Sequence, residues 1–571
     1  MSRGLGDVYK RQTLIELKKD AVITTVGSES HGVTALSGGK VILQDAAVTV
    51  DSTKDAYAFS AEGKDSDTAA VSTITGSGVY NIVGDIRAAD GGILTLNLAA
   101  GSRFEGKAVL DSGNDSQSTL TMAKNSLWTL TGNSQLKSLQ NEQSVIDMTG
   151  DNKAFSTLSV ETLTGNGGTI IMDIDGSQVD ASDKIYVTDD FSGSQILSLK
   201  EINGLDSDPG IGQAAENTVL ASVNGSGTFT ADDQEGTLYW QRYELGQKDS
   251  AASGYTTDWY LKGITNLNLP TTSVEAIAAS GALAYHTWRD HDQLLQRLGD
   301  LRQHGREEEG VWVRVKGGKL SRSDQFEFEN KYTQYELGYD QKLKSTPAYT
   351  RYAGISFSYL DGDSSYSSGS GENKVKALNI YGTQIGAKGH YLDLVVKYSQ
   401  LDNDFKVFDT SGNKITGDYE QNGLLISAEY GRKNNLKNNW YIEPQAQLTF
   451  GRLRGTDYTT SNGIRVGQDG IDSFVGRIGF NIGKDINEKT NIYLKANLMH
   501  EFGGGYNASM VDASGTKARL DRDFDDTWFE YGLGAAVQTG KNNYFYVDVE
   551  RSAGSDFKKD WQWNVGARWT F

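Results

Sequence analysis

The closing stretch Trp561–Phe571, WQWNVGARWTF, decides the fold of the second half of this 571-residue chain. Its large apolar side chains occupy every second position: Trp561, Trp563, Val565, Ala567, Trp569 and Phe571. The positions between them hold Gln562, Asn564, Gly566, Arg568 and Thr570. An alternation of apolar and polar residues with a period of two predicts a β-strand with one apolar and one polar face. The segments Trp440–Phe450, Ile492–Leu498 and Phe529–Val537 repeat this alternation.

Twelve such segments follow Gly310, and they are longer than ordinary strands. They are expected near residues 311–321, 330–343, 350–361, 374–387, 390–404, 417–432, 440–455, 472–485, 490–504, 525–539, 543–555 and 561–571. A soluble β-sandwich also alternates and is the alternative. Aromatic residues at the ends of several apolar faces favour an outer-membrane barrel, whose interfaces carry aromatic girdles.

The links between these segments alternate in length, which supports the barrel. Short links are expected at 344–349, 388–389, 433–439, 486–489 and 540–542, and long ones at 362–373, 405–416, 456–471 and 505–524. An even strand number places both barrel ends on the short-turn, periplasmic side. No stretch approaches the roughly 18 consecutive apolar residues that a transmembrane helix requires.

One long helix is predicted over Thr272–Gln303, after Pro270, with Thr272 and Glu275 as a capping box. Such a helix spans roughly 45–50 Å, more than the ~30 Å hydrocarbon core. It either packs on the barrel surface or threads the lumen. The polar lumen suits its charged residues Arg289, Asp290, Asp292, Gln293, Arg297, Asp300 and Arg302, and the chain must cross the pore if its N-terminal half lies outside.

The N-terminal half is a different kind of region. Residues 13–265 hold 16 basic and 34 acidic residues, whereas residues 266–571 hold 36 and 39, so the net charge of −19 is concentrated before the barrel. Short apolar runs punctuated by Gly, Asn, Asp and Ser recur there and predict stacked coils of a parallel β-helix, with a β-sandwich as the alternative. A pI near 4.9 argues against nucleic acid as a partner.

The first twelve residues, MSRGLGDVYKRQ, have neither an apolar core nor a small-residue cleavage site and are no signal peptide. Residues 1–12 are expected to be a non-native leader, so that the chain is truncated at this end. The chain has no cysteine, which excludes disulfides, thiolate metal sites and a cysteine nucleophile.

Several stretches together resemble the pertactin-like autotransporters of Gram-negative bacteria (type V secretion). They are LWTLTGNSQLKSL (127–139), LSVETLTGNGGTIIMDID (158–175), HTWRDHDQLLQRLGDLR (286–302), GVWVRVKGG (310–318), YELGYDQKL (335–343), WYIEPQAQLTFGRLRGTDY (440–458) and SFVGRIGFNIGKDI (473–486). The resemblance implies an all-β chain: a right-handed parallel β-helix passenger, then a 12-stranded antiparallel transmembrane barrel with one lumenal α-helix.

The expected domains are the leader at 1–12, the truncated passenger at 13–154, an autochaperone-like cap at 155–265, a linker with the lumenal helix at 266–309 and the barrel at 310–571. The family resemblance implies that the barrel lies in the outer membrane and displays its own adhesin-like passenger at the cell surface. The implied partners are outer-membrane lipid, the barrel-assembly machinery (which reads the closing Trp569–Phe571), periplasmic chaperones and a host or cell-surface receptor, with the chain a monomer. The alternative functions are the remnant of a secreted enzyme whose catalytic part lies upstream of residue 13, and a porin-like channel.

No enzyme activity, catalytic residue, cofactor or metal ligand is predicted. Residues 13–265 contain one histidine, His31, too few partners for a serine-protease triad. Gly362-Asp363-Ser364 is placed in a barrel loop, and His286 and His291 have the wrong helical spacing for a metal pair. The acids Asp173, Asp175, Asp180 and Asp183 lack a calcium-loop pattern, and Gly165–Gly168 lacks the helix of a phosphate loop.

Some members of the family release the passenger at an Asn-Asn pair within the lumenal helix. Asp292-Gln293 stands in the comparable stretch here, so asparagine cyclisation has no substrate and the passenger is expected to stay attached unless another protease or an acidic residue acts.

Overall fold

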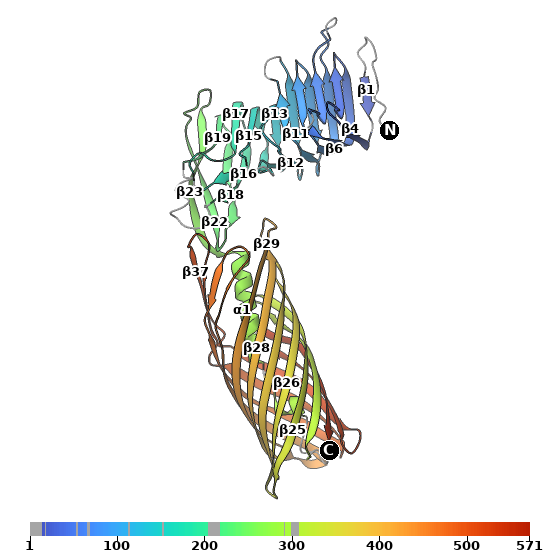
Figure 1. Cartoon of the computed structure of the whole chain (residues 1–571), viewed down its shortest axis with the longest axis vertical. Helices are drawn as coiled ribbons and strands as arrows, with labels where there is room; N and C mark the ends of the chain where they lie inside the picture. Colours follow the sequence, from blue (N-terminus) through green and yellow to red (C-terminus); the bar gives the residue numbers. More distant parts are fainter. Residues whose placement is uncertain are drawn as a thin grey trace. The chain divides into compact units, whose positions relative to one another are not determined.

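The computed structural model describes residues 14–17, 19–52, 55–65, 69–111, 115–150, 154–176, 178–203, 217–290, 292–298 and 308–571. The expected leader at 1–12 lies outside these residues. The chain divides into two compact units, Met1–Asn268 and Leu269–Phe571, which are described separately (Figure 1).

Parallel strand ladders build most of the N-terminal unit, which confirms the β-helix. One ladder runs through β1 (Leu14–Leu17), β2 (Ala21–Thr25), β4 (Lys40–Val50), β6 (Thr73–Val83), β8 (Ile93–Leu98), β9 (Arg103–Glu105), β11 (Gln117–Met122), β12 (Leu127–Thr129), β13 (Ser134–Asn141), β14 (Val145–Asp147), β15 (Thr157–Thr164), β16 (Asn166–Asp175), β17 (Lys184–Phe191), β18 (Ser194–Asn203), β19 (Val219–Gly225) and β20 (Thr228–Ala231). A second parallel ladder joins β3 (Val33–Leu36), β5 (Phe59–Glu62), β7 (Ile86–Ala89) and β10 (Ala108–Leu110).

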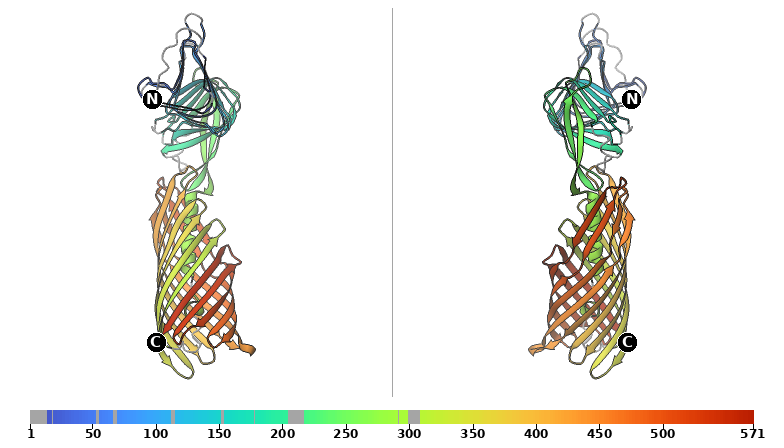
Figure 2. Two further views of the ribbon diagram at one scale, coloured as in Figure 1. Left: turned by 90° about the vertical axis from the view of Figure 1, so that its right-hand side faces the viewer. Right: turned by 90° about the vertical axis from the view of Figure 1, so that its left-hand side faces the viewer.

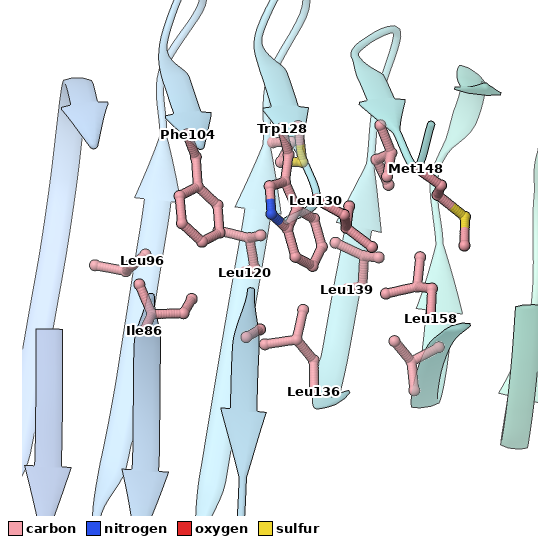
Figure 3. Close-up of a cluster of buried hydrophobic side chains, with 14 of the residues drawn as sticks. Ile86, Leu96, Phe104, Leu120, Trp128, Leu130, Leu136, Leu139, Met148 and Leu158 are labelled. Atoms are coloured by element: carbon pink, nitrogen blue, oxygen red, sulfur yellow. The ribbon is translucent and has the colours of Figure 1, made fainter. Parts of the chain in front are cut away.

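The register stacks like residues on top of one another inside the coil. Leu96, Leu120, Leu139 and Leu163 pair in succession, and all four are fully buried. Trp128 pairs with Phe104 on the preceding coil, where their rings stack at 5.3 Å, and its Nε1 donates to the Gly106 carbonyl at 2.9 Å. Figure 3 shows Leu96, Phe104, Leu120, Trp128 and Leu139 gathered in the interior of the coil. The core of this unit is therefore a column of apolar rungs, stabilised by burial at about 25 cal/mol per Å².

The parallel order ends at the C-terminal side of this unit. β23 (Thr257–Pro270) pairs antiparallel with β19, and β21 (Asp233–Glu235) pairs antiparallel with β22 (Tyr239–Asp249). Trp259 covers the last apolar rung by meeting Phe229 edge-on at 5.5 Å. The parallel ladder continues through the predicted domain boundary at residue 154, because β13 pairs with β15 and β14 pairs with β16 across it.

The second unit contains a closed antiparallel barrel of twelve long strands, as predicted (Figure 2). These are β24 (Gly310–Arg322), β25 (Phe328–Ser345), β26 (Tyr349–Tyr366), β27 (Gly369–Gly386), β28 (His390–Phe408), β29 (Lys414–Arg432), β31 (Trp440–Leu453), β34 (Ile471–Asn487), β35 (Thr490–Glu501), β38 (Thr527–Gln538), β39 (Asn543–Ala553) and β40 (Phe557–Thr570). The short β30 (Asn434–Asn435) and the 3-10 turn η3 (Lys437–Asn439) precede β31. Pairing of β24 with β40, from Gly310↔Thr570 to Arg322↔Phe557, closes the ring.

The two ends of the barrel differ. We call the end with the links 346–348, 387–389, 488–489 and 539–542 the turn end, and the opposite end the loop end. The predicted long links at 362–373 and 405–416 were wrong: β26 and β27 continue to residues 366 and 369, and β28 and β29 to 408 and 414, because their hydrogen-bonded register runs on. The links at 456–471 and 505–524 instead carry a four-stranded sheet of β32 (Thr456–Thr459), β33 (Arg465–Gln468), β36 (Gly505–Val511) and β37 (Lys517–Asp523).

The barrel wall is apolar outside and polar inside. Exposed outer side chains include Leu337, Phe357, Ile380, Leu448, Ile478, Leu494 and Leu533, whereas buried inner ones include Arg314, Glu336, Asp393, Glu429, Arg477, Lys495 and Asp548. A soluble sandwich buries its apolar faces, so this inversion identifies a membrane barrel.

The predicted helix is interrupted. α1 covers Thr272–Arg289 and α2 covers Leu294–Leu298, so the prediction of one continuous helix was wrong at the stretch between them. The predicted last turn at 299–303 lies outside the described residues. Asp290 ends α1 with an extended backbone (φ −61°, ψ 121°), and both Asp290 and Asp292 are ion-paired with the barrel wall. Among the described residues, no helix is both long enough and apolar enough to span a membrane.

Candidate functional site

The barrel lumen is the candidate site, because α1 and α2 lie inside it and their partners come from all sides. Figures 1 and 2 show α1 enclosed by the strands. The lumenal position, predicted against a surface position, is confirmed by bonds from residues 289–298 to β24, β28, β29, β35, β39 and β40.

The first turns of α1 sit at the loop end. The N-cap is Thr271, one residue before the predicted Thr272, and its side chain accepts a hydrogen bond from the Val274 N–H at 3.4 Å. Asn462, in the link between β32 and β33, donates to the Ser273 hydroxyl at 3.0 Å. A Cβ at Gly281 would clash with the ring of Tyr506 on β36. The four-stranded sheet thus lies directly against the helix.

Trp288 anchors the middle of the lumen. Its fully buried ring lies against two inward positions that have no side chain, Gly423 on β29 and Gly451 on β31. A Cβ on Gly423 would overlap the indole, and one on Gly451 would come within 2.9 Å of it. These glycines are therefore set by the close approach of the helix and not by turn geometry.

A charged cluster surrounds the break between the two helices. Lys316 Nζ on β24 lies 2.9 Å from Asp290 and 3.3 Å from Asp292. Arg314, also on β24, bridges Asp292 at 2.5 Å and Glu336 on β25. Lys559 on β40 reaches Asp290 at 3.4 Å. The two Asp side chains at the helix break, Asp290 and Asp292, are thus held by three cations of the barrel wall.

A second set of charges continues this cluster toward β39. Lys495 Nζ lies 2.6 Å from Asp548 and 2.7 Å from Glu550. Gln296 Nε2 on α2 donates to Glu550 at 2.9 Å, and its backbone carbonyl accepts from Asn564 at the same distance. Each buried charge has an opposite partner, which burial of ionised groups requires.

The remaining turns of the helices are fixed the same way. Arg297 Nη2 donates to both carboxylate oxygens of Asp393 on β28, at 2.9 and 2.8 Å. At the other end of the break, Arg289 lies 3.3 Å from Glu501 on β35, and Tyr285 donates to the same carboxylate at 2.7 Å. His286 stacks on Phe557 at 4.0 Å and lies 3.0 Å from an Arg322 nitrogen.

Little open space remains beside the helix break. Cavities of about 30 and 20 Å³ flank it, each with room for about one water molecule. The part of the lumen around the break is therefore filled by the helical segment, whereas a cavity of about 1090 Å³ opens at the turn end, between residues such as Tyr352, Gly386 and Asp485. The arrangement around the break serves to hold a peptide segment inside a barrel.

The residues weighed for chemistry have structural roles. Ser364 lies within β26, not in a loop as predicted, and its hydroxyl donates to Tyr366. His31 Nδ1 accepts from the Tyr57 N–H at 3.0 Å, and the two rings stack. Gly165, between β15 and β16, and Gly167, at the start of β16, adopt positive φ, so the stretch connects two strands. His291 lies outside the described residues.

The Asp cluster of the N-terminal unit binds its own backbone. Asp183, fully buried, accepts hydrogen bonds from the N–H groups of Ser156 at 2.6 Å and Asp173 at 2.7 Å. Burial raises the pKa of Asp183 to about 7 and that of Asp173 to about 6. Within the described ranges, no group of three or more His, Asp or Glu side chains is placed to hold a metal ion.

Sequence reasoning missed the wall cations Arg314, Lys316, Lys495 and Lys559. For Arg314, Lys316 and Lys495 the signal was present: each alternates with the apolar residues of its strand, so its side chain points into the lumen. Lys559 alternates in phase with the outward Trp561 and points inward only because the register shifts between them. Which carboxylates they meet depends on helix position, and spacing along the chain does not show it.

The comparisons with known proteins match both units. Residues 311–550 match the family described as "Autotransporter beta-domain" and residues 136–263 the family described as "Pertactin". A probable autotransporter of Escherichia coli strain K12, YcgV, is 27% identical over 97% of this chain and 60% of its own length. The pertactin autotransporter of Bordetella bronchiseptica is 28% identical over 78% of this chain and 52% of its own length. A serine protease autotransporter of Escherichia coli O44:H18, Pet, is 25% identical over 98% of this chain and 44% of its own length. The chain spans about half the length of the curated relatives it matches.

Proposed function

Because the chain is an autotransporter with a pertactin-like region and a C-terminal β-domain, we propose that it displays its own N-terminal unit on the surface of a Gram-negative cell. One observation carries the proposal: the segment that follows the N-terminal unit runs through the lumen of an apolar-walled barrel. The barrel lies in the outer membrane and the passenger outside. The loop end, where α1 begins, is then the extracellular end.

Folding of the N-terminal unit supplies the direction of transport in this proposal. Each coil that forms outside the cell buries a rung such as Leu120 or Leu139 against the previous one. Burial at about 25 cal/mol per Å² opposes sliding back through the pore. We assign the cap role to residues 155–265, where the antiparallel strands close the ladder, the passenger to 13–154, the linker to 266–309 and the barrel to 310–571.

We assign the passenger a binding, adhesin-like role with no enzymatic activity. The single histidine of residues 13–265, His31, is held by Tyr57. A serine protease among the relatives supports the second candidate, an enzyme whose catalytic part lies upstream of residue 13. The upstream coding sequence separates the two: a domain bearing His, Asp and Ser favours the enzyme, and further Gly-punctuated coils favour the adhesin.

The partners in this proposal follow from the barrel. Outer-membrane lipid surrounds the apolar wall, the barrel-assembly machinery and periplasmic chaperones deliver the chain, and the passenger meets a receptor on a host or neighbouring cell. The chain acts as a monomer, because its own α1 and α2 fill its lumen. The passenger stays attached, since Asp290 and Asp292 are ion-paired and the linker has no Asn-Asn pair.

Protease treatment of intact cells tests the proposal. We expect added trypsin or proteinase K to cleave residues 13–265 and to leave the barrel whole. Protection of those residues in intact cells, with cleavage only after lysis, would refute surface display.

Single-channel recording tests the lumenal segment as a plug. Removal of residues 272–298 is expected to raise the conductance of the barrel. Equal conductance with and without the segment would refute the plug and support the porin-like channel.

A further inference from the structure

A groove on the outer wall of the barrel lies between β34, β35, β38, β39 and β40. Its volume is about 680 Å³, and its lining is mostly apolar, with Phe480, Leu494, Ala496, Tyr531, Leu533 and Val549 among the contributors. The strand register brings these residues together: Phe480 pairs with Ala496, and Ala496 with Tyr531. Ala496 is the small residue between two exposed aromatic rings, so it forms the floor of the groove.

Lys495 and Arg551 both border the groove, but Lys495 is buried in the lumen against Asp548 and Glu550, so Arg551 is the cation on the outer face. Arg551 points outward on β39, pairs in register with Tyr531 and precedes Ala553, which pairs with Phe529. It therefore lies within the apolar wall and near the loop end. Lys558, also exposed, lies on the neighbouring β40 and still closer to the loop end.

Two other cations on the outer wall near the loop end, Lys319 and Arg452, are paired with carboxylates. Lys319 lies 2.6 Å from Glu329 and 3.6 Å from Asp560, and Arg452 lies 2.9 Å from Asp472. Within the described part of the chain, neither Arg551 nor Lys558 has an ion-pair or hydrogen-bond partner. An unpaired Arg on a lipid-facing wall is unfavourable, and the cost is smallest where an anion of the membrane interface meets it.

We infer that this groove binds a phosphorylated, multiply acylated glycolipid of the outer leaflet, with an acyl chain over Ala496 and sugar phosphates at Arg551 and Lys558. A guanidinium binds phosphate through two parallel N–H···O bonds, and an apolar trough between aromatic rings accepts a hydrocarbon chain. Two cations on adjacent strands fit a headgroup that carries two phosphates. The inference rests on the proposed function only for the choice of leaflet, since that function makes the loop end extracellular.

Native mass spectrometry of the purified full chain in detergent tests the site, with diphosphorylated lipid A as the probe. We expect wild type to retain one lipid and Arg551→Gln to bind about tenfold more weakly, the loss expected for one charge-assisted contact. Arg452→Gln, which removes a paired outer-wall arginine, is the matched control and should bind as wild type does. Ala496→Trp fills the floor of the groove and should also weaken binding without removing charge.

Each result decides the proposal. Unchanged binding by Arg551→Gln and Ala496→Trp, in protein that retains the heat-modifiable gel shift of a folded barrel, overturns it. Equal Arg551-dependent retention of dioleoyl phosphatidylglycerol overturns the glycolipid assignment in favour of a phospholipid. Lipid binding is measured on purified protein in detergent and surface display on intact cells, so the two experiments are independent. Loss of lipid binding would not change the protease result, and a failure of surface display would not change the number of lipids bound.

Discussion

Replacing Arg297 by methionine tests whether the lumenal ion pairs fix the helical segment in the barrel. Arg297 and Asp393 are both almost fully buried and form two bonds of 2.9 and 2.8 Å. Coulomb attraction at this distance is about 6 kcal/mol at an effective dielectric constant of 20. The substitution leaves the Asp393 carboxylate with the Thr383 hydroxyl as its neutral donor, at 2.5 Å. Loss of one partner of a buried pair costs about 3–5 kcal/mol, and we expect a loss of that size.

The measurement is guanidinium-induced unfolding of the full chain in detergent micelles, followed by tryptophan fluorescence. Arg452→Met is the control, because Arg452 and Asp472 are more than half exposed and their pair should contribute below about 1 kcal/mol. The double variant Arg297→Met/Asp393→Leu should regain most of the loss, since it leaves no unpaired buried charge. Equal losses for Arg297→Met and Arg452→Met, or a double variant as unstable as the single one, would refute the reasoning.

Three further outcomes are expected. The raised pKa of Asp183, about 7, means that its proton is held more tightly in the folded state than in the unfolded state, so the thermal stability of the N-terminal unit should fall as pH rises from about 4 to 7. Asp183→Asn should flatten this dependence, and an unchanged slope would contradict it. Trp128→Ala should lower the free energy of unfolding by about 3–5 kcal/mol, because it leaves a cavity in the core. Val79→Ala, at an exposed position, should lower it by less than about 0.5 kcal/mol. Similar losses for the two variants would contradict the stacked core. Gly423→Val should impair barrel assembly, seen as loss of the heat-modifiable gel shift, and Trp288→Ala should restore it; failure of rescue would show that the indole is not the obstacle.

The strand number and the closing pair of the barrel follow from local pattern. Alternation in stretches such as Trp561–Phe571 marks which side chains face lipid, and the observed wall confirms it. The loop end was less predictable. The Gly- and Ser-rich stretch at 362–373 has the composition of a loop, yet it forms a hairpin, because pairing of β26 with β25 and of β27 with β28 continues into it.

The sequence predicted where the candidate site lies, but not which side chains contact one another in it. A charged helix before an even-stranded barrel indicates a lumenal segment, and the structure confirms that position. The helix break at Asp290 could not be predicted from helix propensity, because its cause is tertiary: wall cations such as Lys316 and Lys559 bind its carboxylate across the lumen. The same holds for Gly423, whose role appears only where Trp288 meets the wall.

The sequence by itself determined the division into an acidic coil-forming half and an alternating barrel half, since both depend on periodicities of neighbouring residues. Only the tertiary structure decided which charges meet inside the barrel and which cations, such as Arg551, face lipid without a partner. The physical reason is range. Strand alternation is a property of consecutive residues, whereas a buried ion pair or a groove requires segments that are far apart in the sequence to reach one point in space.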